Sequence, residues 1–172
     1  YPGLHYAFAN GHTDTIKAYI DSILNLLQEK TLGSDQAVQL LTAKDKNHCR
    51  SLYYALIKGH ADTVKAYMDG ILNLLQTKSL SEDQAVQLLE AKDEDGHYPC
   101  FDIAMEKGHT DTVKAYMNGI LNLLQTKSLS ADKAIPLLLA AKDKSHCRGL
   151  YYALSKGHAD TVKAHMDGIH NL

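Results

Sequence analysis

The chain has 172 residues and a formal net charge of −2, from 18 basic and 20 acidic side chains. A charge this close to neutral gives no electrostatic support for binding nucleic acid or an anionic membrane surface. The sequence holds no apolar run of the roughly 18 residues that a membrane-spanning helix requires, so we expect none.

The cysteine content favours a reducing compartment. There are three cysteines, and two of them, Cys49 and Cys147, occupy the same position of a repeated pattern. An odd number in this arrangement argues against a disulfide framework. We therefore expect a cytoplasmic setting, in the cell that makes the protein or in a host cell.

An internal repeat organises the chain. The segment KGHADTVKA at 58–66 recurs with small changes three more times, and the Gly-His pairs begin at residues 11, 59, 108 and 157. A spacing of about 49 residues is typical of stacked repeats that share one continuous core. We expect one array with units at about 1–43, 44–92, 93–141 and 142–172. Because the chain opens and stops inside a repeat, we expect it to be a piece of a longer array.

The second unit shows the elements that we expect in each copy. The polar segment 44–50 predicts a loop, and segment 52–59 predicts a short helix that ends at Gly59, where a left-handed residue costs little. Residues 61–78 predict a long amphipathic helix that continues without a break through Gly70. Its expected core face consists of Val64, Met68, Ile71, Leu72 and Leu75.

A third, shorter helix follows in each complete unit. Ser81 and Gln84 have the spacing of a capping box, and Ser130 holds the equivalent N-cap position in the next unit. That later copy is one residue longer and carries Pro136 inside its helix, which predicts a local π-bulge or kink. No segment alternates apolar and polar residues over enough positions to predict a β-strand, so the predicted fold class is all-α.

The units also alternate in type. Segments 44–71 and 142–169 match at 24 of 28 positions, whereas the first and third units share a Tyr-Pro pair and a Gly-His-Thr triplet. The predicted loop tips alternate in charge as well, basic in the second and fourth units and acidic in the third. A partner of mixed charge would explain this pattern, and so would a recent duplication of two units without selection for binding. Both explanations stay open.

The segment DEDGHYPCFDIAMEKGHTDTVKA at 93–115 resembles the ankyrin repeat, which places an acidic residue, a Gly turn, a Pro, an Ala and a Gly-His pair in this order. The segment YPGLHYAFANGH at 1–12 is similar. Tyr1 and Tyr98 stand where that family has Thr, the second and fourth units lack the Pro, and the period exceeds the usual value of about 33. The surplus corresponds to a longer second helix and to the third helix. In style, the repeats are similar to enlarged ankyrin-like arrays of secreted virulence effectors from enteric bacteria.

This resemblance implies an ankyrin-like helical solenoid with an extra helix per unit, acting as a non-catalytic scaffold that binds another protein. Such arrays bind through their concave face and loop tips. The short helices would add His5, Tyr54, Glu106 and Tyr152 as further candidates. The main candidates for partner binding are Lys46, His48, Arg50, Tyr53, Glu94, Asp95, His97, Asp102, Lys144, His146, Arg148 and Tyr151.

Two other roles compete with this one. The array could be the substrate-recruiting or targeting arm of a larger secreted effector enzyme, or a structural spacer without a partner. The tyrosines have a packing alternative, as half-buried core residues. Self-association through exposed array ends is a further expectation, because such ends normally need a capping repeat.

The residues that could support chemistry do not form a recognisable site. Cys49, Cys100 and Cys147 come from successive units, and stacked helices lie about 8–10 Å apart, too far to share a zinc ion with ligand distances of about 2.0–2.3 Å. We expect no metal, no cofactor and no catalytic residue. The Gly-His histidines recur in every unit, which indicates a structural imidazole that bonds backbone groups at helix ends. They are His12, His60, His109 and His158.

Overall fold

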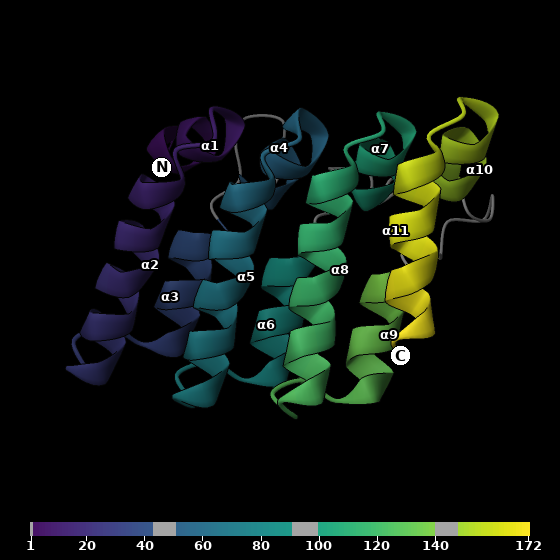
Figure 1. Ribbon diagram of the computed structural model, residues 1–172. Coiled ribbons are helices and arrows are strands. Elements are labelled where there is room, and N and C mark those ends of the chain that lie inside the picture. The colour runs from purple at the N-terminus through teal and green to yellow at the C-terminus, as the bar shows by residue number, and fades with distance from the viewer. Residues whose placement is uncertain (1, 43–50, 91–99, 140–147) are drawn as a thin grey trace.

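The computed structural model describes residues 2–42, 51–90, 100–139 and 148–172 (Figure 1). Every regular element in these residues is an α-helix, which confirms the all-α class. The short helices are α1 (Pro2–Ala9), α4 (Ser51–Lys58), α7 (Cys100–Glu106) and α10 (Arg148–Ser155). The long helices are α2 (Thr13–Gln28), α5 (Ala61–Gln76), α8 (Thr110–Gln125) and α11 (Ala159–His170). The third helices are α3 (Ser34–Leu41), α6 (Glu82–Leu89) and α9 (Ala131–Leu139).

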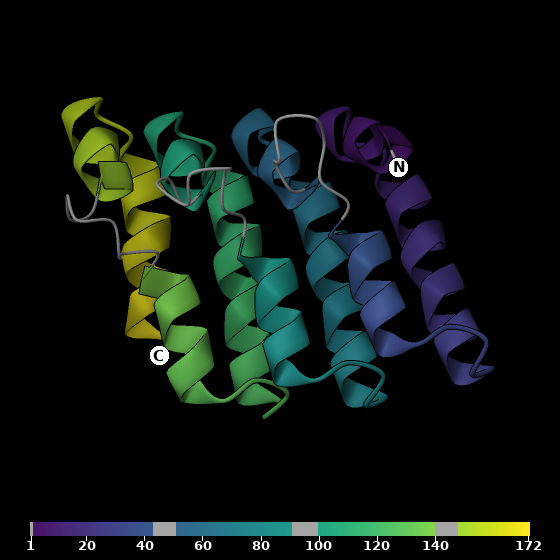
Figure 2. The same cartoon turned by 180° about the vertical axis from the view of Figure 1, so that it is seen from behind.

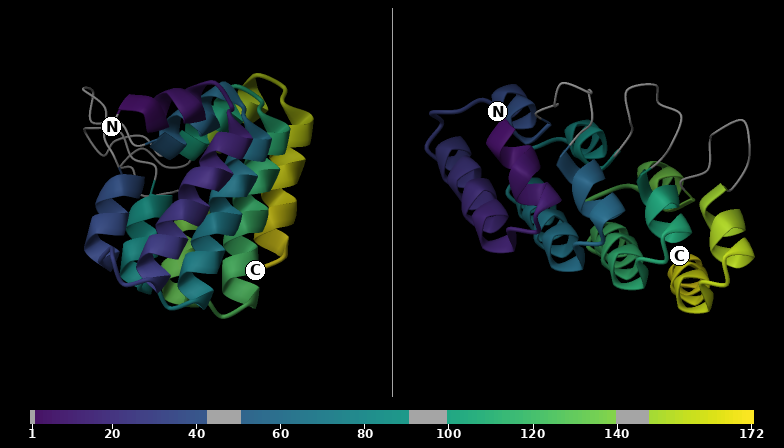
Figure 3. Two further views of the ribbon diagram at one scale, coloured as in Figure 1. Left: turned by 90° about the vertical axis from the view of Figure 1, so that its left-hand side faces the viewer. Right: turned by 90° about the horizontal axis from the view of Figure 1, so that it is seen from above.

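Helices of each kind lie side by side in three rows. The long helices pack in the order α2, α5, α8 and α11, and the short helices pack in the order α1, α4, α7 and α10. The third helices form a row on one side of the long ones, the side that faces the viewer in Figure 2, and the short helices cross the upper ends of the long helices (Figure 3). Each unit therefore contacts its neighbours along the chain, and the two ends of the described chain lie at opposite ends of the rows (Figure 1).

The glycines inside the long helices allow these helices to pack closely. Helix α5 continues without a break through Gly70, as the sequence predicts. A Cβ added at Gly119 would lie 2.6–2.8 Å from three side-chain atoms of Met68, closer than carbon atoms can approach. A Cβ added at Gly70 would likewise collide with the side chain of Ile20. The glycines thus form a seam into which the preceding helix inserts a large apolar side chain.

One apolar core runs along the rows. The large side chains Phe8, Leu56 and Met105 hold equivalent positions in three short helices, and each is at most 1% exposed. Tyr67 and Tyr116 on the long helices are buried in the same core. Of the helices that the structure describes, none is long and apolar enough to cross a membrane.

The third helices begin with different caps. The capping box predicted for α6 is confirmed, because Gln84 N–H donates to Ser81 Oγ at 3.2 Å and Ser81 N–H donates to Gln84 Oε1 at 2.9 Å. Helix α9 is α-helical over its whole described length with Pro136 inside it, so the predicted π-bulge does not occur in these residues, and the alternative of a kink stays a prediction. Pro136 is exposed, and water can bond the carbonyl that its missing amide leaves free. Residues 140 and 141 lie outside the described part of the chain.

Two turns per unit use left-handed backbone, but only one of them uses glycine. The turn after α5 is a Schellman motif centred on Lys78, with φ of 55°, and Lys30 and Lys127 repeat it. The turn after α4 is the same motif centred on Gly59, with φ of 79°. A left-handed conformation alone therefore does not explain why glycine recurs in the Gly-His turns.

Candidate functional site

The Gly-His turns form the main polar connection between units. Gly59 N–H bonds the carbonyl of Leu56 and His60 N–H bonds the carbonyl of Ala55, so the turn satisfies the last carbonyls of α4. His60 is also the N-cap residue of α5 and, like the other Gly-His histidines, makes no side-chain bond to its own helix. Its imidazole is directed toward the preceding unit.

Each imidazole bonds the end of the preceding short helix. The Nε2–H of His60 donates to the carbonyl of Ala9 at 2.9 Å, and His109 and His158 donate to Ile57 and Glu106 at 3.2 and 3.0 Å. The predicted structural role is confirmed for His60, His109 and His158, whereas His12 in the first unit is exposed. The bond, however, crosses from one unit to the previous one, which the sequence did not indicate.

The same imidazoles explain the glycines. The His60 ring lies against Gly11, where an added Cβ would come within 2.9 Å of Nδ1. His109 lies against Gly59 in the same way, at 2.8 Å. At Gly157, which no imidazole covers, an added Cβ would meet nothing within 4 Å. Glycine is thus required where the next unit places its histidine.

Hydrogen-bonded threonine pairs reveal that the unit interfaces alternate. Thr13 and Thr63 share a hydrogen bond of 2.9 Å between the first and second units, and Thr110 and Thr161 share one of 2.7 Å between the third and fourth. Between the second and third units the position of the first hydroxyl is occupied by Ala61. The alternation in the sequence therefore extends into the interfaces between the units.

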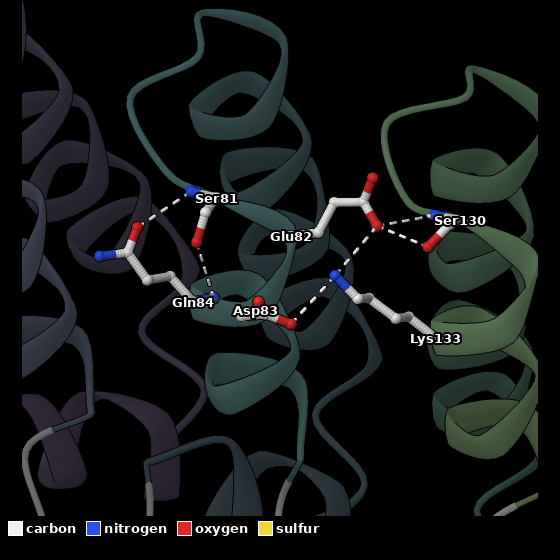
Figure 4. A network of polar contacts seen from close by, with 6 residues as sticks. All are labelled: Ser81, Glu82, Asp83, Gln84, Ser130 and Lys133. Atoms are coloured by element: carbon white, nitrogen blue, oxygen red, sulfur yellow. Dashed lines mark hydrogen bonds and ion pairs between the residues drawn. The ribbon is translucent and has the colours of Figure 1, made fainter.

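A polar network joins α6 to α9 at the N-terminal ends of both helices (Figure 4). Helix α9 has Lys133 where α6 has its capping Gln84, and the neighbouring Glu82 substitutes for the missing amide oxygen. Glu82 Oε2 accepts from Ser130 Oγ at 2.6 Å and from Ser130 N–H at 3.1 Å. Lys133 Nζ lies 3.5 Å from Glu82 Oε2 and 3.0 Å from Asp83 Oδ1. The network replaces a local cap by a contact between units.

The electrostatics of this network follow from its contacts. The hydroxyl and then the backbone amide of Ser130 hold the pKa of Glu82 below its ordinary value, because both bonds favour the ionised carboxylate. The hydrogen bond to Asp83 raises the pKa of Lys133. Both side chains are about one-third exposed, so solvent screens the pair and the network stabilises the contact only modestly.

His165 lies in apolar surroundings on α11. It stands where other long helices carry Tyr67 and Tyr116, is 7% exposed, and lies 5.7 Å from the Phe101 ring, centroid to centroid. Its Nδ1 has no hydrogen-bond partner in the described residues. Burial lowers the pKa of His165, because the imidazolium is poorly solvated there.

The row of short helices carries a surface rich in tyrosine, which we call the short-helix surface. It consists of Tyr6 on α1, Tyr53 and Tyr54 on α4, and Tyr151 and Tyr152 on α10. Tyr6 and Tyr151 are 69% and 65% exposed, whereas Tyr53 and Tyr54 are half-buried. The paired rings pack edge to face, at 5.2 Å between centroids in α4 and 5.4 Å in α10.

The structure describes only part of the predicted binding set. Tyr53 and Asp102 are half-buried on α4 and α7, and Tyr151 is exposed on α10. Arg148 begins α10, but its side chain lies outside the description. The remaining predicted residues lie outside the described residues, and they are Lys46, His48, Arg50, Glu94, Asp95, His97, Lys144 and His146.

Two residues of the short helices differ from expectation. His5 is buried and its Nδ1 lies 3.1 Å from Ser51 Oγ, so it packs between α1 and α4 rather than on the surface. Tyr6 is the most exposed tyrosine of the surface, yet the sequence reasoning omitted it. Its alignment with Tyr54 and Tyr152 in the repeat was the signal that could have identified it.

Within the described ranges, no three histidine, cysteine or acidic side chains gather closely enough to hold a metal ion. A comparison with models of known protein families finds no match, and a comparison with curated proteins finds none either.

Proposed function

We propose that this chain is an ankyrin-like helical array with a third helix per unit, and that it binds another protein through the short-helix surface. The Gly-His turn between a short and a long helix supports the ankyrin-like assignment. The stacking of helices of the same kind, unit against unit, supports an array.

The exposure of Tyr6 and Tyr151 is the observation that carries the binding proposal. Large aromatic side chains that remain two-thirds exposed contribute nothing to the core, whereas they supply rigid contact area to an interface with few rotors to freeze. The outward face of the long helices differs, because it carries charged side chains such as Lys17 and Lys163. An array without a partner would have no reason to concentrate aromatic surface on one row of helices.

The proposal is tested by affinity capture on two matched double variants. Tyr6→Ala with Tyr151→Ala removes aromatic area from the first and fourth units, and Lys17→Ala with Lys163→Ala changes exposed long-helix positions in the same units. A partner retained by the intact chain and the lysine variant, but lost by the tyrosine variant, supports the short-helix surface. Circular dichroism must show the same helix content in all three proteins.

Two results would contradict the proposal. Retention of the partner by the tyrosine variant would move binding to another face. The absence of any specific partner for the intact chain would favour the spacer role.

A further inference from the structure

The middle of the short-helix row carries partly exposed apolar side chains. Tyr54 on α4 and Ile103 on α7 hold equivalent positions of adjacent helices, and Ile57 lies three residues after Tyr54, on the same face of α4. All three side chains are half-buried. Both helices have a short helix packed on each side, so this exposure belongs to the interior of the described array.

A lysine stands four residues after Tyr54 and another four residues after Ile103. These are Lys58 and Lys107, and both are exposed. Together with the three apolar side chains they form a surface that we call the central strip. Lys107 Nζ donates to the carbonyl of Ile57 at 3.3 Å. Neither lysine forms an ion pair with a described residue, so both ammonium charges are open to an acidic partner.

The acidic side chains of α7 do not offset this charge. Glu106 is paired with Lys156 of α10, with 2.8 Å between Oε1 and Nζ. Asp102 lies against α10 instead of the strip, since a Cβ added at Gly149 would come within 2.7 Å of its Cα and 2.5 Å of its Oδ1. The central strip therefore combines apolar surface with two positive charges.

The lysines on the outward face of the long helices have different surroundings. Lys65 lies between Asp62 and Asp69, three residues after the first and four before the second, and Lys114 follows Asp111 by three residues. Side chains at these spacings are neighbours on a helix, so their charges offset one another. The central strip thus differs in charge from the long-helix face of the same two units.

We propose that the central strip binds an acidic segment of another protein. Apolar side chains of this segment pack on the tyrosine and the isoleucines of the strip, and its carboxylates pair with Lys58 and Lys107. This inference rests on the proposed function, since it specifies the partner of the same row of helices. Packed helices lie about 8–10 Å apart and an extended polyproline-type segment advances about 3.1 Å per residue, so acidic residues about three positions apart would reach both lysines.

Selection from a random peptide library displayed on phage tests the inference, and fluorescence anisotropy then measures the affinity of the selected peptides. The unchanged chain should enrich peptides that combine acidic and apolar residues. Lys58→Glu with Lys107→Glu should raise the dissociation constant of these peptides about tenfold or more, because like charges then meet across the contact. The same variant should enrich basic peptides instead.

The matched control is Lys65→Glu with Lys114→Glu, which makes the same charge change at exposed long-helix positions of the same two units. It should bind the selected peptides as the unchanged chain does. Circular dichroism must show equal helix content in all proteins. If charge reversal perturbs the fold, Lys58→Gln with Lys107→Gln removes the two charges without repulsion and should still weaken binding and its dependence on salt.

A further variant tests the apolar part of the contact. Ile57→Ser introduces the residue that the fourth unit has at this position, Ser155, so the fold accommodates it. It should weaken binding of the selected peptides and leave the salt dependence unchanged, because it removes apolar area and no charge.

Three results would overturn the inference. They are enrichment of basic or uncharged peptides by the unchanged chain, no enrichment at all, and an equal loss of affinity in the matched control. The proposed function fails or stands separately. If a partner captured by the intact chain is lost by Tyr6→Ala with Tyr151→Ala but kept by the Lys58 and Lys107 variants, the short-helix surface binds that partner and the inference of an acidic segment is wrong.

Discussion

Replacing Gly108 by alanine tests the idea that the Gly-His glycines make room for a histidine of the next unit. Gly108 has φ of 71° and Gly157 has φ of 74°, so alanine meets the same backbone strain at both positions. That strain costs about 1–2 kcal/mol. Only at Gly108 would the new Cβ also meet an imidazole, 2.7 Å from Nδ1 of His158.

The extra loss at Gly108 can be worked out from the contact that must break. A displaced His158 ring no longer donates to the carbonyl of Glu106, a bond of 3.0 Å whose loss costs about 0.5–1.5 kcal/mol. We therefore expect Gly108→Ala to lower the free energy of unfolding by about 2–3 kcal/mol, and Gly157→Ala by about 1–2 kcal/mol. Both positions affect the docking of the fourth unit, so the difference does not reflect where the change lies in the array.

Urea unfolding followed by circular dichroism measures both losses, and a double-mutant cycle identifies their cause. In a His158→Ala background the ring is absent, so Gly108→Ala should cost no more than Gly157→Ala. The reasoning fails if the two single variants lose equal stability, because the imidazole contact would then be irrelevant. It also fails if the excess at Gly108 persists without His158.

Four further changes test other contacts. Gly119→Ala should destabilise the chain because the new Cβ would collide with Met68, although alanine in a helix is normally about 1 kcal/mol more stable than glycine. Urea unfolding should show that adding Met68→Ala relieves much of this loss. Lys78→Gly should raise the free energy of unfolding by about 0.5–1 kcal/mol, because it removes a left-handed lysine, and an unchanged or lower value would contradict this. Because burial lowers the pKa of His165, the unfolded chain binds the proton more readily than the folded chain does. Stability should therefore fall as the pH drops below the ordinary pKa value of 6.5. Thermal unfolding at several pH values should show that this loss is smaller in His165→Tyr. Because the pKa of Glu82 is lowered in the folded chain, its carboxylate stabilises the fold above about pH 4.5, and this stabilisation is lost as the pH falls below that value. Glu82→Gln should lower the free energy of unfolding by less than about 1 kcal/mol, and added salt should make the difference smaller.

Periodicity predicted the elements well because each element depends on residues that are close in sequence. The long helix passes through Gly70 because its apolar face continues on both sides, and the box formed by Ser81 and Gln84 needs only a spacing of three. The π-bulge predicted at Pro136 does not occur in residues 131–139, and the predicted alternative of a kink stays open, because a one-residue difference in length does not say where in the unit the extra residue is accommodated.

The periodicity of the sequence could not predict the contacts between units. The sequence indicated that His60 bonds a helix end, but the short helix of its own unit and that of the preceding unit both offered carbonyls, and only the packing selects Ala9. The cap of α9 is supplied by Glu82, which precedes Ser130 by 48 residues, and the spacing of residues within one helix cannot show this. The candidate binding residues depend even more on such packing, since most of them belong to segments outside the described residues.

The alternation of the units extends to the contacts between them. Thr13 bonds Thr63 within the first pair of units and Thr110 bonds Thr161 within the second pair, whereas the junction between the pairs has Ala61. A block of two units that is duplicated as a whole keeps its internal threonine contact and creates a different contact at each junction. Alternating charge at the loop tips would be copied with the same block, so that charge pattern alone is no argument for a partner of mixed charge. The tyrosines of the short helices carry the stronger argument for binding, because they lie on one row of helices and Tyr6 and Tyr151 stay largely exposed in the described part of the chain.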